Sequence, residues 1–227
     1  MMLSNPKSFY ESKYYLRYMQ LTWLGHDGFL IESDKIVYID PYQISDTLPK
    51  ADVILITHSH GDHFSEQDIA KIKTEKTIII TSFDIRMTGE HVALVTGDEF
   101  VNSIKGIFVR AVPAYNLNKR FHPMENEWNG YILEIEGKKV YHAGDTDFIP
   151  EMKNIVCDIA LLPVSGTYVM TADEAAQAAI AIKPKIAIPM HFGSVVGSVN
   201  DAEHFARKLE NSGIRAIIPK KGIAITL

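Results

Sequence analysis

The sequence lacks the features that mark disulfide-bonded, membrane-spanning and nucleic-acid-binding proteins. Its 227 residues hold one cysteine, Cys157, which excludes an intrachain disulfide and fits a reducing compartment. No run approaches the roughly 18 consecutive apolar residues of a membrane span, and residues 1–20 lack the apolar core of a secretory signal. The 23 basic residues form no long run, so no obligate nucleic-acid partner is indicated. We therefore expect a cytoplasmic protein that acts on a small molecule, with a homo-oligomer as one option.

The remaining composition is that of an ordinary globular protein. Hydrophobic residues make up 46% of the chain and charged residues 22%, with a net charge of −5. Residues 1–18 are polar and tyrosine-rich, and we interpret them as an N-terminal extension. Residues 19–227 are expected to form a single domain.

Three histidines and one aspartate crowd into six residues directly after an apolar run at 53–56. Zinc and similar borderline metals accept imidazole nitrogen and carboxylate oxygen, whereas calcium and magnesium prefer oxygen alone. The glycine within the run bends the chain, so one short loop can serve two neighbouring metal positions. The alternative is a polar, solvated loop. The four candidate ligands are His58, His60, Asp62 and His63.

Two further candidates follow predicted strands. Asp145 comes after Gly144 at the end of a strand over 139–142, and His191 comes directly after a strand over 185–190. Alone, an aspartate after glycine is usually a turn former and a single histidine is usually a core residue. Beside the histidine-rich run, both are interpreted as metal ligands, with Asp145 placed between the two positions.

Several other polar residues have two alternative roles each. His142 is expected to support a ligand or to pack in its strand, and His26 either lines the site or forms a turn. Lys119 and Arg120 lie in a long loop, where an anionic substrate could meet them, although a solvated loop is the default. Cys157 is interpreted as a small core residue.

Two stretches of the chain resemble each other at an offset of a little over a hundred residues. The hairpin at 28–40 is similar to that at 130–143, and an acidic residue, Asp52 or Asp158, precedes the next strand in each half. This weak duplication indicates two similar β-sheets facing each other, with helices outside. Helices are predicted over 65–73, over 171–183 from a capping box, and over 201–211, with a helical turn near 83–87.

The motifs HSHGDH at 58–63, GDT at 144–146 and PMH at 189–191 occur in this order. Together they resemble the motif set of the metallo-β-lactamase superfamily. The sequence at residues 22–26 and 141–146 is most similar to one branch of that superfamily, the small hydrolases related to ascorbate-6-phosphate lactonase. The resemblance covers residues 19–227 and implies an α/β fold, a four-layer αββα sandwich of two facing mixed sheets, with metals at one rim.

By this resemblance, His58 and His60 bind one metal, Asp145 bridges, and the second position takes three ligands: Asp62, His63 and His191. The family's remaining ligand is a histidine in a sequence such as Pro-Ala-x-His, whereas this chain has Asn116 at the matching position. Three replacements stay open: the Asn116 carbonyl oxygen, the His122 imidazole, or a water. We expect one or two divalent ions, zinc first, with manganese and iron as alternatives.

The implied activity is metal-dependent hydrolysis of a small lactone or phosphodiester. The metals would lower the pKa of a water, and Asp62 would orient that water or accept its proton. One rival is an iron-dependent oxidoreductase on the same scaffold. The other is a degenerate metal-binding module that lost catalysis with the missing histidine.

Overall fold

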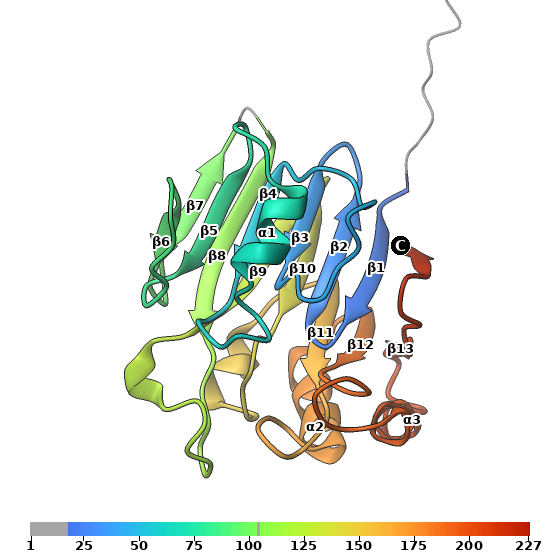
Figure 1. Ribbon diagram of the computed structural model, residues 1–227. Coiled ribbons are helices and arrows are strands. Elements are labelled where there is room, and N and C mark those ends of the chain that lie inside the picture. The colour runs from blue at the N-terminus through green and yellow to red at the C-terminus, as the bar shows by residue number, and fades with distance from the viewer. Residues whose placement is uncertain (1–17, 104) are drawn as a thin grey trace, which may run out of the picture.

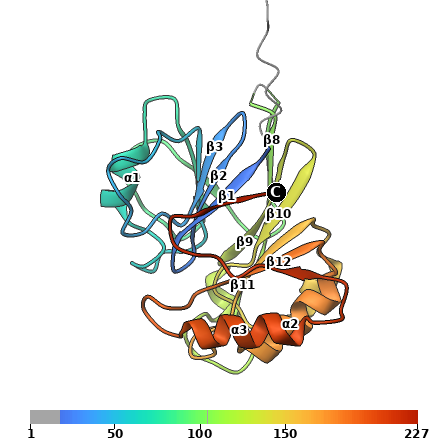
Figure 2. The ribbon, with the colours of Figure 1, turned by 90° about the vertical axis from the view of Figure 1, so that its right-hand side faces the viewer.

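The computed structural model describes residues 18–103 and 105–227, so most of the predicted extension at 1–18 lies outside the described residues. Two seven-stranded sheets face each other, with helices on the outer faces (Figures 1 and 2). This confirms the predicted sandwich. Within the described residues, no helix is long and apolar enough to cross a membrane.

The first sheet comes from the N-terminal half, completed by the last strand of the chain. Helix α1 (Glu66–Ile72) lies on its outer face (Figure 2). The strand order is β14 (Ala224–Thr226), β1 (Gln20–Gly25), β2 (Gly28–Glu32), β3 (Ile36–Ile39), β4 (Val53–Ile56), β5 (Ile78–Ser82) and β6 (Val92–Leu94).

The second sheet comes from the C-terminal half, and helices α2 (Ala172–Ile182) and α3 (Val199–Lys208) cover it. Two short 3-10 helices, η1 (Met124–Asn126) and η2 (Pro150–Asn154), lie in its connections. The strand order is β13 (Arg215–Ala216), β12 (Ile186–Met190), β11 (Ile159–Pro163), β10 (Lys138–His142), β9 (Asn129–Ile135), β8 (Ile107–Pro113) and β7 (Glu99–Asn102).

Strand β4 shows how the layers are held together. Its four residues are all buried, and successive side chains of a strand point to opposite faces. Val53 and Leu55 join the core between the sheets, whereas Ile54 and Ile56 pack with Ile69 of α1. A strand covered on both faces is therefore a continuous apolar run, as the sequence showed.

The predicted duplication is present in the pairing of the strands. In each half an antiparallel hairpin is followed by two parallel pairings: β2–β3–β4–β5 and β9–β10–β11–β12. Asp52 Oδ2 accepts a hydrogen bond from the Ile36 N–H, and Asp158 Oδ2 accepts one from the Lys139 N–H, both at 3.0 Å. The parallel strands of both halves end at one rim.

The helices follow their predicted caps, with one exception. Thr171 closes the expected capping box at the start of α2, and Ser65 caps α1. Helix α3 begins two residues earlier than predicted, because Asp201 accepts a hydrogen bond from the Ser198 N–H at 2.7 Å, and it ends at Lys208, three residues before its predicted end. The predicted helical turn at 83–87 is wrong: this segment is an irregular turn in which Asp84 Oδ2 accepts a hydrogen bond from Trp128 Nε1 at 2.7 Å.

Candidate metal centre

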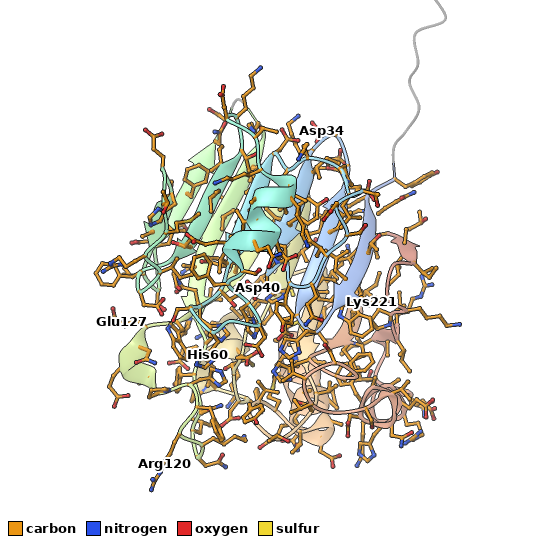
Figure 3. All side chains as sticks on the ribbon, in the orientation of Figure 1. Asp34, Asp40, His60, Arg120, Glu127 and Lys221 are labelled. Atoms are coloured by element: carbon orange, nitrogen blue, oxygen red, sulfur yellow. The ribbon has the colours of Figure 1, made fainter. Side chains whose placement is uncertain are left out.

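The rim between the sheets gathers the predicted metal ligands: six of the seven fall into compact groups, and Asp62 contacts one of these groups through His26. His60 and Asp40 mark its position near the lower edge of the first sheet (Figure 3). In each of three groups, one potential ligand atom per residue lies within 4.8 Å of the others: His26, Asp27, His63 and His191; His58, His60 and His122; and His58, His63 and Asp145.

These side chains fit a metal because several of their buried atoms make no hydrogen bond and face one another at ion-pair distances. His63 Nε2, His122 Nε2 and Asp145 Oδ1 are buried and make no hydrogen bond. Buried polar atoms are normally hydrogen-bonded, so such a set requires an explanation. Two ligand atoms about 2.1 Å from a tetrahedral zinc lie about 3.4 Å apart. His63 Nε2 is 3.5 Å from Asp145 Oδ1, and His191 Nε2 is 3.3 Å from Asp145 Oδ2.

The first position is formed by histidines from two separate segments. His58 and His60 follow β4, with 3.1 Å between His58 Nε2 and His60 Nδ1. His122 comes from the loop after β8, and its Nε2 lies 3.1 Å from Asp145 Oδ2. Burial lowers the pKa of both His58 and His60, which favours the neutral imidazole that a metal requires.

Asn116 holds His122 in this position. Asn116 Oδ1 lies 3.0 Å from the His122 backbone nitrogen, whose N–H donates to it, and 3.3 Å from His122 Nδ1. The Asn116 N–H donates to the His122 carbonyl at 2.7 Å, and its side-chain Nδ2 donates to the Tyr168 carbonyl at 2.9 Å. Of the three replacements left open by the sequence, this geometry favours the His122 imidazole.

In the second position, each histidine ring is held through its Nδ1 atom, the nitrogen that points away from the centre. His63 Nδ1 lies 2.8 Å from Asp40 Oδ2, which orients Nε2 toward Asp145. Asp40 is fixed in turn by the Thr57 N–H, which donates to its Oδ1 at 2.8 Å. His191 Nδ1 lies 2.8 Å from Ser165 Oγ. Such partners set the tautomer of a ligating histidine.

Without metal, charge pairing holds this cluster together. Burial opposes ionisation of Asp145, but His191 and His63 outweigh it and hold the pKa of that carboxyl well below its usual range. Burial also opposes protonation of His191, but Asp145 and then Asp27 raise its pKa to about 9. A cation that binds here therefore displaces protons from imidazole.

Asp62 is not a member of these groups, but it contacts one of their residues, His26. Its side chain is 28% exposed, and its Oδ2 lies 3.0 Å from His26 Nε2. Burial opposes its ionisation, but the His26 hydrogen bond and the His63 charge lower its pKa to about 2. His26 lines the site and also stands in the turn between β1 and β2, so both of its expected roles are present. Metal binding by Asp62 stays a prediction.

Sequence reasoning missed Asp27 and the role of Asp40. Asp27 is fully buried, and burial raises the pKa of its carboxyl group. In the sequence it looks like a turn residue between two strands, and Asp40 looks like a strand end; only the adjacent His26 was a signal. His142 does support the site, because its Nε2 lies 2.9 Å from the Asp27 carbonyl oxygen and its Nδ1 accepts from the Gly144 N–H.

The two basic residues of the loop do not enter the centre. Lys119 forms an ion pair with the buried Asp147, and Arg120 points away from the body of the protein at the loop tip (Figure 3). No hydrogen bond or ion pair among the described residues joins a lysine or arginine to the clustered histidines, Asp27, Asp62 or Asp145.

Comparison with known proteins identifies the family. The Beta-lactamase superfamily domain matches residues 20–191. The UPF0173 metal-dependent hydrolase of Nanoarchaeum equitans is 35% identical over 219 residues, covering 92% of this chain and all of that protein. The chain belongs to the UPF0173 family of metal-dependent hydrolases in the β-lactamase superfamily. The family member from Pyrococcus abyssi is 31% identical and covers 92% of this chain and all of that protein.

Two solved structures show the same hydrolase fold. A Parabacteroides distasonis protein, provisionally named a metal-dependent hydrolase, superposes with a TM-score of 0.81 at 36% identity and covers 89% of this chain and 93% of that one. Igni18, a metallo hydrolase of Ignicoccus hospitalis, has a TM-score of 0.77 at 25% identity, covering 92% and 98%. These names specify no substrate, so the resemblance to the lactonase branch stays a prediction.

Proposed function

We propose that this hydrolase opens the ring of a small lactone, with zinc as its metal. The observation that carries the proposal is that, among the described residues, no hydrogen bond or ion pair joins a lysine or arginine to the clustered side chains. A phosphodiester carries a full negative charge, which enzymes commonly meet with Arg or Lys beside the metal, and here the metals alone would have to meet it. A lactone carries none, and negative charge develops on its carbonyl oxygen only during the reaction.

The side chains of the rim form two metal positions. His58, His60 and His122 would hold one zinc, and His63, His191 and Asp145 would contribute to the other. When bound there, zinc would supply a lowered pKa for a water and polarisation of the substrate carbonyl.

Asp62 is the residue placed to act on the water itself. Its carboxylate is ionised at neutral pH and partly open to solvent, so it can accept a hydrogen bond from the attacking water. His26 Nε2 holds that carboxylate through one of its oxygens, at 3.0 Å. Asp62 therefore orients the water, while the low pKa of about 2 makes it a weak base.

The proposal is tested with protein stripped by a chelator and reloaded with zinc. Hydrolysis of dihydrocoumarin, a neutral lactone, is compared with hydrolysis of bis(p-nitrophenyl) phosphate, a phosphodiester. We expect kcat/KM for the lactone to exceed that for the phosphodiester by at least about tenfold, which corresponds to ~1.4 kcal/mol of transition-state stabilisation. Faster phosphodiester cleavage, or lactone hydrolysis that is unchanged by chelation, would refute it.

A further inference from the structure

His60 is a candidate metal ligand whose ring has no hydrogen-bonded support. Its Nδ1 faces His58 Nε2 at 3.1 Å, so these are the two atoms that would meet an ion in the first position. The second ring nitrogen of His60, Nε2, makes no hydrogen bond to any residue that the structure describes. Ligating histidines almost always donate that second N–H to a partner, which fixes the ring. Another contact must therefore orient the ring of His60.

The other four histidines assigned to the two positions each have a partner at one ring nitrogen, Nδ1. The partners lie at 2.8 to 3.3 Å and are Thr57 Oγ1 for His58, Asn116 Oδ1 for His122, Asp40 Oδ2 for His63 and Ser165 Oγ for His191. His60 is also the histidine of this set that is only half-buried. It is thus the ligand whose position depends most on packing.

The packing partner of His60 is the indole of Trp128. The two ring centroids lie 4.7 Å apart at an interplanar angle of 71°, the edge-to-face arrangement that aromatic rings favour. The same indole lies 4.8 Å from the ring of His58 and 5.4 Å from that of His122, between centroids. Trp128 is buried, so its indole has little freedom to move away from these rings.

Trp128 is held in turn by the segment at the end of β5. Its Nε1 donates to Asp84 Oδ2 at 2.7 Å, and Ser82 Oγ donates to Asp84 Oδ1. Its backbone carbonyl accepts from the Ala114 N–H at 3.0 Å. Ser82 ends a strand of the first sheet, whereas Trp128 directly precedes β9 of the second. A hydrogen bond between the two halves of the sandwich therefore fixes the indole against the histidines.

We propose that Trp128, anchored by Asp84, is the positioning residue of His60 and orients its imidazole in place of the hydrogen-bond partner that the other ligands have. The indole has one donor and no acceptor, so Trp128 acts through His60 and is not itself a ligand. The inference rests on metal binding by this centre, which the proposed function also requires, but not on the identity of the substrate.

Variants that separate the indole from its anchor test the assignment. Wild type and four variants are stripped with a chelator and titrated with Co²⁺, followed by calorimetry and cobalt absorption: Trp128→Leu, Trp128→Phe, Asp84→Ala and Asp84→Asn. We expect Trp128→Leu and Asp84→Ala to weaken one binding equivalent at least about tenfold, the lower limit typical of residues that orient a ligand. Trp128→Phe keeps an aromatic ring and Asp84→Asn keeps an acceptor, so each should bind within about threefold of wild type.

Fluorescence gives a readout that does not depend on activity. The chain has two tryptophans, so Trp23→Phe leaves Trp128 as its only indole. Trp23 stacks on Phe192, with centroids 4.7 Å apart, and no ring contact among the described residues joins it to the first position. In this background Co²⁺ should quench the emission, and adding Asp84→Ala should move the emission to longer wavelength and weaken cobalt binding together. A shifted emission with unchanged cobalt affinity would assign Trp128 a purely structural role and overturn the proposal.

Unfolding and a double-variant cycle separate positioning from a loss of fold. The unfolding temperature of Trp128→Leu should fall further below wild type in Co²⁺ than in chelator, because the variant loses metal affinity as well as packing. Since Trp128 acts through His60, adding Trp128→Leu to His60→Ala should not weaken cobalt binding further. Equal destabilisation in both conditions, or additive losses of affinity, would overturn the proposal.

The half-buried Asp84 keeps the test independent of how Trp128→Leu folds, because Asp84→Ala leaves the indole itself in place. Wild-type cobalt affinity in Asp84→Ala and in Trp128→Leu would overturn the proposal, whatever the activity of the protein. The expected losses of cobalt affinity, in a protein whose wild type hydrolyses no lactone, would refute the proposed substrate and leave the role of Trp128 intact.

Discussion

Replacing Asn116 by alanine tests how this chain compensates for the histidine that its family places there. The variant removes the oxygen that accepts from the His122 N–H and faces His122 Nδ1, so both the backbone and the ring of His122 lose their support. Residues that orient a metal ligand typically contribute 10–100-fold to metal affinity. We therefore expect Asn116→Ala to weaken zinc binding at the first position by about that factor.

The same substitution has a predictable effect on stability. It leaves the buried N–H of His122 without an acceptor, which costs about 1–3 kcal/mol. For a chain of this size, each kcal/mol lowers the unfolding temperature by about 2–4 °C, so a decrease of about 2–12 °C is expected in chelator. Asn118→Ala, on the exposed part of the same loop, is the matched control and should change neither property.

The assay is competition for zinc with a chromophoric chelator, applied to wild type, Asn116→Ala, His122→Ala and the double variant. Because Asn116 acts through His122, the double variant should bind zinc no more weakly than His122→Ala alone. Additive losses would show that Asn116 contributes independently, and unchanged affinity in His122→Ala would refute the ligand assignment.

Three further predictions concern other parts of the centre and the thiol. Asp40→Asn should weaken zinc binding about 10–100-fold, measured by the same competition, because it disturbs the hydrogen bond to His63 Nδ1; wild-type affinity would contradict this. The pKa of His191 is raised to about 9 in the metal-free fold, so it stabilises that fold fully below its unfolded value of about 6.5 and progressively less as pH rises to 9. The urea midpoint in chelator should therefore fall across this window, and a rising midpoint would refute the pairing. Burial raises the pKa of Cys157 to about 12, so a thiol reagent at pH 8 should modify native protein far more slowly than unfolded protein, and equal rates would contradict it.

The sequence predicts those parts of the fold that local chemistry determines. The apolar run of β4 requires burial on both faces, and the capping box at Thr171 begins a helix wherever the chain places it. The repeated hairpins predicted two facing sheets because each half carries its own pairing pattern. The turn at 83–87 could not be predicted, since Trp128, 44 residues away, holds Asp84 by its indole.

The site was predictable where several ligands lie close together in the sequence. The spacing of His58, His60 and His63 in the sequence is enough to predict them as ligands. His122 is positioned by its contacts with Asn116, which the sequence does not show. Asp27 carries no distinctive pattern. Its position becomes informative only when folding brings His63 and His191 to it from the ends of two separate strands.

The most direct test of the metal-dependent account measures metal content and turnover in the same samples of wild type and Asp145→Ala. Asp145 lies between the two positions, with Oδ1 near His63 and Oδ2 near both His122 and His191. After dialysis against zinc, elemental analysis should show one to two zinc ions per wild-type chain and fewer in the variant, with lactone hydrolysis lost in parallel while the fold is retained. Wild-type turnover and unchanged zinc content in Asp145→Ala would contradict the account.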